Sequence, residues 1–160
     1  MSALQKLKET AFLRVFTMLK IPLIAYLKPV VEELTDERCE IRLPLLRRSK
    51  NHLGAMYFGA LCAGADCAGG LIAMRQIQKG SGRVVFVFKD FKADFKKRAE
   101  GDVVFACEDG AKLIKLVQQA EQSGERVEET VDVIATCPDK LGTEPVGVFQ
   151  LTISLKARQR

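Results

Sequence analysis

The chain has 160 residues, of which 48% are hydrophobic and 28% charged, with a formal net charge of +5. This size and composition favour one domain with a sizeable core, and the modest positive charge favours an anionic ligand only weakly. The most apolar stretch, residues 55–74, contains an acid and four glycines, which excludes a clean membrane span. Five scattered cysteines without a CxxC pair and a single histidine argue against a disulfide framework and a metal site, so a reducing cytoplasm is the expected location.

The first segment, residues 2–20, is predicted to be an amphipathic helix with Ser2 as its N-cap. Pro22 ends this helix or opens a short second turn through Tyr26. Charged residues precede any hydrophobic segment, which is not typical of a signal peptide. We expect this extension, residues 1–26, to pack on the domain. Docking on a membrane surface or a partner helix is the alternative, which the mixed charges of the polar face disfavour. The apolar stripe of the helix consists of Leu4, Leu7, Ala11, Val15 and Met18, widened by Phe12, Phe16 and Leu19.

Two strands are predicted next, at residues 29–34 and 38–43, on either side of a turn at residues 35–37. In the second strand apolar and charged residues alternate, a pattern typical of a half-buried strand. The segment that follows, residues 47–50, is rich in Arg and Lys. We expect it to be a solvated loop, with phosphate contact near a ligand mouth as the alternative.

The rest of the chain is organised around residues 51–78, which we predict to form a central helix over residues 56–76 after a loop. This helix is crowded with glycine, and each glycine inside a helix costs about 1 kcal/mol relative to alanine. Such a helix needs close approach to other backbones, so we expect it to be buried against a sheet, with a second subunit as a further neighbour. Asp66 has no charged neighbour from His52 to Met74, which makes it a candidate functional group.

The remaining elements complete a sheet. Two strands, a long helix and four more strands joined mostly by short turns predict an α+β fold, in which an antiparallel sheet wraps around the central helix over residues 28–157. The basic tail, residues 156–160, is expected to fray. The later elements are strands at residues 84–95, 103–108, 127–136 and 146–155, a helix at residues 109–122 that Gly124 ends, and a loop with Pro138 and Gly142.

Two motifs stand in the order found in a known family. Asn51 precedes the segment Tyr57-Phe58-Gly59-Ala60-Leu61, which leads to Ala65-Asp66, where the family has an Asn, an HGG-type helix start and ALxxxAD. Further on, Phe91 to Asp102 is similar to the family pattern F-x-x-P-A-x-x-G-D, with Arg98 at the proline position. In this combination, over residues 30–155, the chain resembles the hotdog-fold thioesterase superfamily. The nearest type is the PaaI-like acyl-CoA thioesterases and their uncharacterised relatives.

The resemblance implies roles for single residues. Asp66 corresponds to the catalytic acid, the backbone N–H of Phe58 to the amide that polarises the thioester carbonyl, and Asn51 to an Asn that orients the nucleophile. Two positions depart from the family, since Tyr57 replaces a His and Phe58 replaces a Gly. A Phe at this position keeps the backbone amide, whereas its side chain narrows the space for the acyl group. The substrate-binding candidates are Tyr57, Gly59, His52, Lys96, Lys97 and Arg98.

Each candidate also has a structural interpretation. His52 could be a structural residue of the loop, and Tyr57 could serve packing alone. The cations of residues 96–98 could form an ordinary basic turn or a site for the phosphates of coenzyme A. Asp66 could instead be a buried acid bonded to a neighbouring strand or to its symmetry mate, and Asn51 a loop residue.

The sequence therefore predicts an acyl-CoA thioesterase that releases free acid and coenzyme A and needs no further cofactor. Phe58 and Asp66 lie eight residues apart on one helix, so the resemblance implies a homodimer, or a dimer of dimers, in which Asp66 of one subunit faces the Phe58 amide of the other. A non-catalytic acyl or acyl-CoA-binding protein is the alternative. A dehydratase is disfavoured because His52 is the single histidine. A nucleic-acid binder would need a basic face with interleaved aromatics, whereas the basic turn holds only three cations in a row. Stable membrane insertion is not expected.

Overall fold

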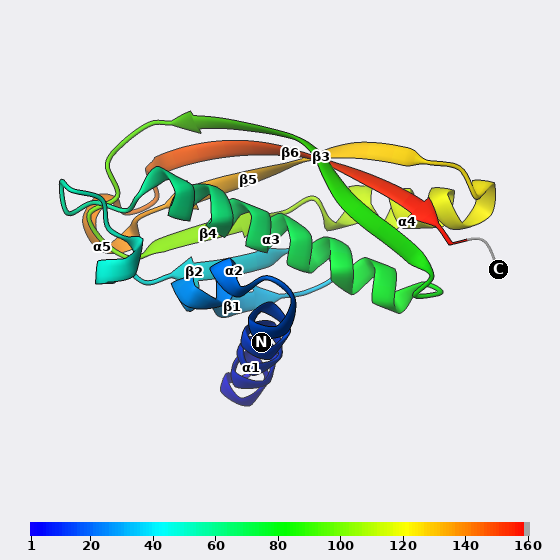
Figure 1. Cartoon of the computed structure of the whole chain (residues 1–160), viewed down its shortest axis with the longest axis horizontal. Coiled ribbons are helices and arrows are strands. Elements are labelled where there is room, and N and C mark those ends of the chain that lie inside the picture. Colours follow the sequence, from blue (N-terminus) through cyan, green and yellow to red (C-terminus); the bar gives the residue numbers. More distant parts are fainter. Residues whose placement is uncertain (159–160) are drawn as a thin grey trace.

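The structure is a computed structural model that describes residues 1–158. Six strands form one antiparallel sheet in the order β1-β2-β4-β5-β6-β3, and Figure 1 shows this sheet curved around the long helix α3, as predicted. The strands are β1 (Val30–Leu34), β2 (Cys39–Leu43), β3 (Val84–Phe95), β4 (Val103–Cys107), β5 (Val127–Thr136) and β6 (Pro145–Ala157). The helices are α1 (Ala3–Lys20), α2 (Pro22–Leu27), the 3-10 turn η1 (Arg47–Ser49), α3 (Phe58–Lys79), α4 (Gly110–Ser123) and α5 (Pro138–Leu141).

The glycines of α3 allow the sheet to approach its backbone closely. A Cβ built on Gly64 would lie 2.3 Å from the ring of Phe105 on β4, and this ring is fully buried. That separation is well below a van der Waals contact, so only glycine fits beneath the ring. At Gly69 a Cβ would lie 3.6 Å from Leu151 and Val131, which is an ordinary contact. The predicted burial of a glycine-rich helix against a sheet is confirmed, and Gly64 is where it is tightest.

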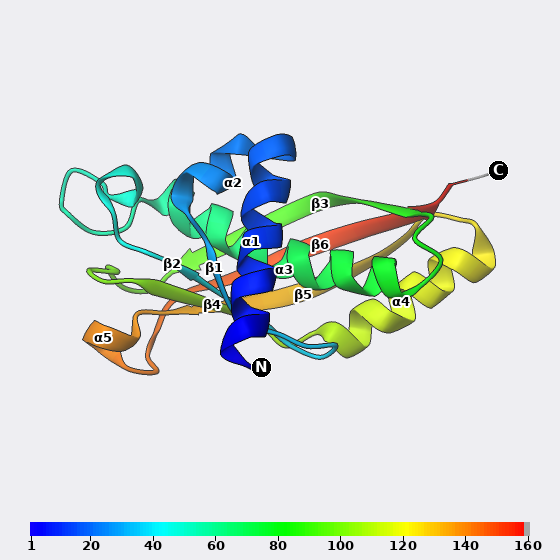
Figure 2. The same ribbon diagram turned by 90° about the horizontal axis from the view of Figure 1, so that it is seen from below.

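The N-terminal helix α1 lies against β1, which is one edge of the sheet (Figure 2). Its contacts with this strand include polar ones. The Val31 N–H donates to Thr10 Oγ1 at 3.0 Å, and Lys6 forms an ion pair with Glu32 at 3.2 Å. The threonine hydroxyl therefore satisfies an amide that a sheet edge would otherwise leave without a partner.

Most of the apolar stripe of α1 faces away from the domain, whereas Phe16 at its margin is half-buried. Thr10, Leu13 and Thr17 are the buried residues of this helix, whereas Leu7 and Met18 expose 66% and 62% of their surface. The helix packs on the domain as expected, but it does so through the opposite side. The reason is that the edge of β1 offers backbone and charged groups, which the polar side of the helix can bond.

The other edge of the sheet is β3. One side of this strand pairs with β6 along its whole length, and within residues 1–158 no strand pairs with its other side. Val87 and Phe95 on β3 expose 55% and 45% of their surface. A long, partly apolar free edge is a ready site for pairing with another chain.

Several element boundaries differ from the prediction. The loop at residues 138–141 contains α5, because Pro138 starts a turn whose Lys140 and Leu141 amides bond the Cys137 carbonyl. Strand β6 continues to Ala157, so this part of the tail is paired with β3 and is not frayed. Residues 159–160, the end of that tail, lie outside the described residues. Within residues 1–158, no helix combines the length and the apolar character needed to cross a bilayer.

Candidate functional site

The acid in the middle of α3 faces an apolar cavity of about 410 Å³. Among residues 1–158, Asp66 is the one charged side chain that lines it. The other lining residues come from α1, α2, α3 and β3, and they are Leu13, Phe16, Thr17, Ile21, Ile24, Cys67, Gly70, Leu71, Met74, Phe86, Val87 and Phe88. A carboxylate in such surroundings has lost much of its hydration without gaining a polar replacement.

The electrostatics of this cavity follow from that burial. Burial raises the pKa of Asp66 from 3.8 to about 6, and no charge or hydrogen bond from the described residues offsets it. The carboxylate is therefore mostly ionised at neutral pH, yet it is more basic than an exposed aspartate. Burial, together with the charge of Asp66, also raises the pKa of the Cys67 thiol. Cys67 consequently lacks the thiolate character of a nucleophile. Among residues 1–158, no cluster of three His, Cys, Asp or Glu side chains could hold a metal ion.

The start of α3 is positioned by two backbone hydrogen bonds. The Met56 N–H donates to the Ala99 carbonyl and the Tyr57 N–H to the Ser49 carbonyl, both at 2.8 Å. These bonds hold residues 56–57 outside the helix, with Tyr57 extended as the N-cap. The helix therefore begins at residue 58, two residues later than predicted.

The first turn of α3 presents free amides. The Tyr57 carbonyl accepts the Ala60 and Leu61 N–H groups at 2.9 and 3.1 Å, which are the first bonds of the helix. Within residues 1–158, the amides of Phe58 and Gly59 have no acceptor. With the helix dipole behind them, they form a partial positive site suited to an oxyanion.

A second cavity of about 570 Å³ lies at this end of the helix. Of the site residues predicted from the sequence, it brings seven together: Asn51, His52, Tyr57, Phe58, Lys96, Lys97 and Arg98. Its aromatic residues contact one another, since the Phe58 ring centroid lies 4.7 Å from that of Tyr57 and 6.2 Å from that of Phe95. Gly59 is next to this cluster, and a Cβ on it would lie 2.4 Å from the Tyr57 ring.

Three polar residues of the second cavity have identifiable partners. Asn51 Oδ1 accepts the Leu53 N–H at 2.9 Å, which closes a turn in the loop. Lys96 forms an ion pair with Asp94, and Lys97 forms one with Glu144. These cations are exposed, so the ion pairs contribute little to stability and leave both side chains free to rearrange around a ligand.

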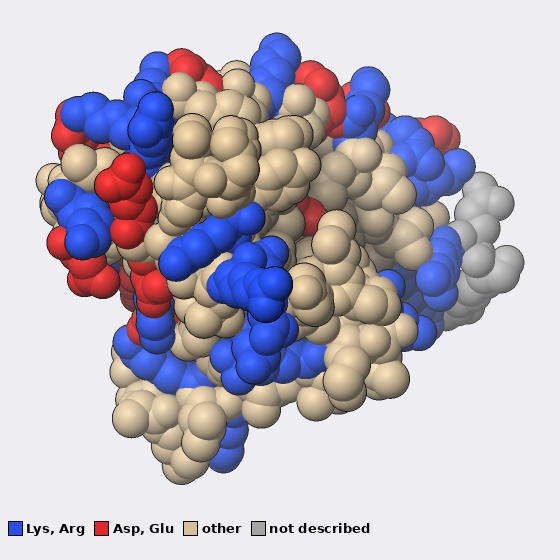
Figure 3. Space-filling model, turned by 60° about the vertical axis from the view of Figure 1, so that its left-hand side comes forward, with Lys and Arg blue, Asp and Glu red and all other residues tan. Residues whose placement is uncertain are grey.

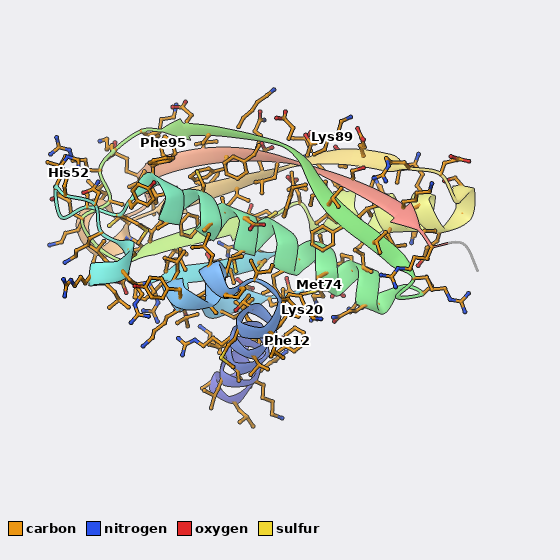
Figure 4. All side chains as sticks on the ribbon, in the orientation of Figure 1. Phe12, Lys20, His52, Met74, Lys89 and Phe95 are labelled. Atoms are coloured by element: carbon orange, nitrogen blue, oxygen red, sulfur yellow. The ribbon has the colours of Figure 1, made fainter. Side chains whose placement is uncertain are left out.

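The structure places the predicted acid and the predicted amide apart. Residues 58 and 66 are separated by about 12 Å along α3, since each residue of a helix rises about 1.5 Å. In Figure 4, His52 and Phe95, which line the second cavity, lie at one end of α3, whereas Met74, which lines the Asp66 cavity, lies farther along it. The Asp66 carboxylate and the Phe58 amide of one chain are therefore too far apart to act on the same carbonyl. This agrees with the prediction from their eight-residue spacing.

Part of the Asp66 cavity was not anticipated. The sequence reasoning did not assign α1, α2 or the first half of β3 to a site, although these elements supply Phe16, Ile24 and Phe88 to its wall. Leu13 and Thr17 are separated by four residues and lie outside the apolar stripe. That spacing is the one signal that could have indicated a second, inward-facing side of α1.

Known structures show what this chain is similar to. A Pseudomonas aeruginosa protein of unknown function, described as a probable thioesterase, has a TM-score of 0.76 at 24% identity, covering 93% of this chain and 96% of that one. A Chlorobaculum tepidum protein of unknown function has a TM-score of 0.79 at 14% identity, covering 96% and 97%. A Haemophilus influenzae thioesterase has a TM-score of 0.66 at 12% identity, covering 89% and 88%. These similarities confirm the hotdog fold.

The model of one family, described as a domain of unknown function (DUF4442), matches residues 9–155. No curated protein matches the chain.

Proposed function

Because the chain belongs to the DUF4442 family and has the hotdog fold of thioesterase structures, we propose that it hydrolyses acyl-CoA thioesters. The observation that carries this proposal is the lone carboxylate of Asp66 in an otherwise apolar cavity. Burial raises the pKa of Asp66 to about 6, so the carboxylate is ionised at neutral pH and more basic than an exposed aspartate. Among the described residues no partner lowers this pKa. The apolar wall of the cavity suits the acyl chain.

The proposed chemistry needs two groups. The Asp66 carboxylate removes a proton from water, which attacks the thioester carbonyl, or the carboxylate attacks that carbon itself. The Phe58 N–H donates to the oxygen that becomes negatively charged, and the tetrahedral intermediate then collapses and expels the coenzyme A thiolate. If the carboxylate attacks directly, the acyl group is left on Asp66 as a mixed anhydride, which water then hydrolyses to the free acid and the carboxylate. Asn51 would help to orient the nucleophile. Apart from coenzyme A as part of the substrate, this scheme needs no cofactor.

The scheme also needs a second copy of the chain. Asp66 and the Phe58 amide are about 12 Å apart in one chain, and two-fold association would let each site take one group from either subunit. The free edge of β3, with Val87 and Phe95 exposed, supports a homodimer formed through this strand. A dimer of such dimers is compatible with the same contact.

Coenzyme A would bind at the second cavity. Lys96, Lys97 and Arg98 lie at its rim, where their charges can meet the phosphates of the ligand. The aromatic rings of Tyr57 and Phe58, with His52 beside them, would contact the rest of the substrate at the helix start.

A non-catalytic acyl-binding protein is the second candidate. The observation that favours it is the exposed pair of rings at Tyr57 and Phe58, which lie together at the helix start that carries the amides proposed as oxyanion donors. If these rings exclude the thioester carbonyl, the protein would bind an acyl ligand without hydrolysing it.

Release of free thiol from a panel of acyl-CoA esters tests both candidates. We expect turnover on at least one chain length, and a loss of about 10²-fold or more in Asp66→Asn, because the general base is removed. Asp139→Asn is the matched control, since Asp139 is an exposed acid on α5 outside both cavities. Full turnover in Asp66→Asn would remove Asp66 from the mechanism. Acyl binding without turnover in the unchanged protein would favour the non-catalytic candidate.

A further inference from the structure

The N-terminal helices expose several large apolar side chains. We define the outer apolar face as Leu4, Leu7, Val15, Met18 and Leu19 of α1 and Leu23 of α2, whose exposed fractions range from 53% to 71%. Leucines, methionine and valine at this exposure are rarely gathered on one helical element of a monomer unless something covers them.

The outer apolar face cannot turn inward, because the other side of α1 is already bonded to the domain. Thr10 accepts the Val31 N–H, and Arg14 Nε donates to the Pro29 carbonyl at 3.1 Å. Rotating the helix to bury its stripe would break these bonds and expose the cavity wall that Leu13 helps to form.

The charge of the protein is concentrated in the same segment. Residues 1–28 contain five Lys or Arg and one Glu, so they hold +4 of the net charge of +5, and the rest of the chain is nearly neutral. In Figure 3 the lower end of the molecule, which α1 forms, is tan and blue with almost no red. The single acid of the segment, Glu9, is half-buried and lines a small groove between α1 and the domain.

Three of these cations are free to meet a partner. Lys8, Lys20 and Lys28 are exposed, and among residues 1–158 none of them has an acid within ion-pair distance. Lys6 is paired with Glu32 and contributes less. The N-terminal segment therefore combines exposed apolar side chains with unpaired positive charge.

We propose that the outer apolar face docks on an anionic lipid surface, with α1 and α2 lying in the plane of the lipid headgroups. A basic helix with an exposed Leu-, Val- and Met-rich side is suited to this position, because its apolar side enters the headgroup region while its lysines meet anionic lipids. The contact is peripheral and agrees with the lack of a bilayer-spanning helix within the described residues.

A second copy of the chain is the less suitable occupant. A two-fold contact through this face would bring together the N-terminal segments of both copies, each with five cations and the half-buried Glu9 as its single acid. An anionic lipid surface satisfies the apolar and the positive character together.

Docking would bring the Asp66 cavity close to the lipid. The inner side of the same helices supplies Phe16, Ile21 and Ile24 to the cavity wall, so about one helix diameter, ~10 Å, separates the cavity from the lipid. The docking itself does not depend on the proposed hydrolase activity and is tested without it.

The test is co-sedimentation of the full chain with vesicles of phosphatidylcholine, with and without about 30% phosphatidylglycerol. We expect binding to the anionic vesicles, weak binding to the neutral ones, and release of the protein as salt is raised, because the lysines attract the surface by charge. Lys8→Gln/Lys20→Gln should reduce binding to the anionic vesicles alone.

The variant Leu7→Gln/Leu19→Gln should lower the vesicle partition coefficient by about tenfold or more, because two leucines no longer enter the lipid. Leu53→Gln/Ile134→Gln is the matched control, since these residues are also exposed but lie in a loop and on β5. All four leucine and isoleucine positions are at the surface, so unchanged thermal unfolding verifies that each variant is folded.

Two results would overturn the proposal. The first is equal vesicle binding by Leu7→Gln/Leu19→Gln and its control, or no vesicle binding at all. The second is a fall in the sedimentation mass of Leu7→Gln/Leu19→Gln, without vesicle binding by the unchanged protein, which would assign the outer apolar face to a contact between copies.

Discussion

Replacing Asp66 by Asn tests whether any ion pair or hydrogen bond compensates for the free-energy cost of burying this carboxylate. The substitution keeps the shape of the side chain and removes its charge. The side chain faces an apolar cavity, and the described residues offer it neither an ion pair nor a hydrogen bond. We therefore expect Asp66→Asn to be more stable than the unchanged protein at neutral and alkaline pH.

The magnitude follows from the pKa of Asp66, which is about 6 in the folded protein and 3.8 for an unperturbed aspartate. Below the lower value the carboxyl is neutral in both states, and the folded protein carries no penalty. As the pH rises through about 6, the folded state must hold a buried charge and that stability is lost. Each pKa unit corresponds to about 1.36 kcal/mol, so the full penalty is about 3 kcal/mol.

Urea unfolding of both proteins at a series of pH values measures this difference. The advantage of Asp66→Asn in free energy of unfolding should be about 3 kcal/mol near pH 8 and should vanish below about pH 3. Asp139→Asn, an exposed acid, should differ from the unchanged protein by less than about 0.5 kcal/mol throughout. A variant that is less stable at pH 8, or a difference that does not change with pH, would refute the argument that the charge is buried without a partner.

Two further predictions concern α3. Gly64→Ala should lower the free energy of unfolding in urea by about 1–3 kcal/mol, because the new methyl group clashes with Phe105. Gly69→Ala should leave it unchanged or raise it by up to about 1 kcal/mol, because the methyl group fits there. Equal effects of the two variants would contradict the close-approach argument. Phe58→Gly keeps the backbone amide and removes the exposed ring. Hydrolysis of acyl-CoA esters with bulkier acyl groups should therefore rise relative to that of esters with short ones. An unchanged preference among acyl groups would show that the ring does not narrow the acyl-binding slot.

The local patterns of the sequence were sufficient for the order and type of the main elements. Strands β3 and β5 have the predicted bounds, and Gly124 ends α4 with a φ of 69°, as a glycine in that position can. The glycines of α3 predicted close packing before Phe105 was known to provide it. The lone acid at residue 66 followed from the same stretch, because a single carboxylate in an apolar helix stands out in sequence alone. The roles of Asp66, Asn51 and the Phe58 amide stay predictions.

Tertiary structure decided which side of α1 is buried and which elements surround Asp66. Periodicity locates an apolar stripe on a helix, but it does not say what the domain offers to that helix. The edge of β1 presents the Val31 amide and Glu32, so α1 bonds through Thr10 and Lys6 and its stripe remains outside. The cavity at Asp66 joins α1 and α2 to α3 and β3, which are distant in the chain. Such a cavity depends on long-range packing, whereas element type depends on residues within a few positions of each other.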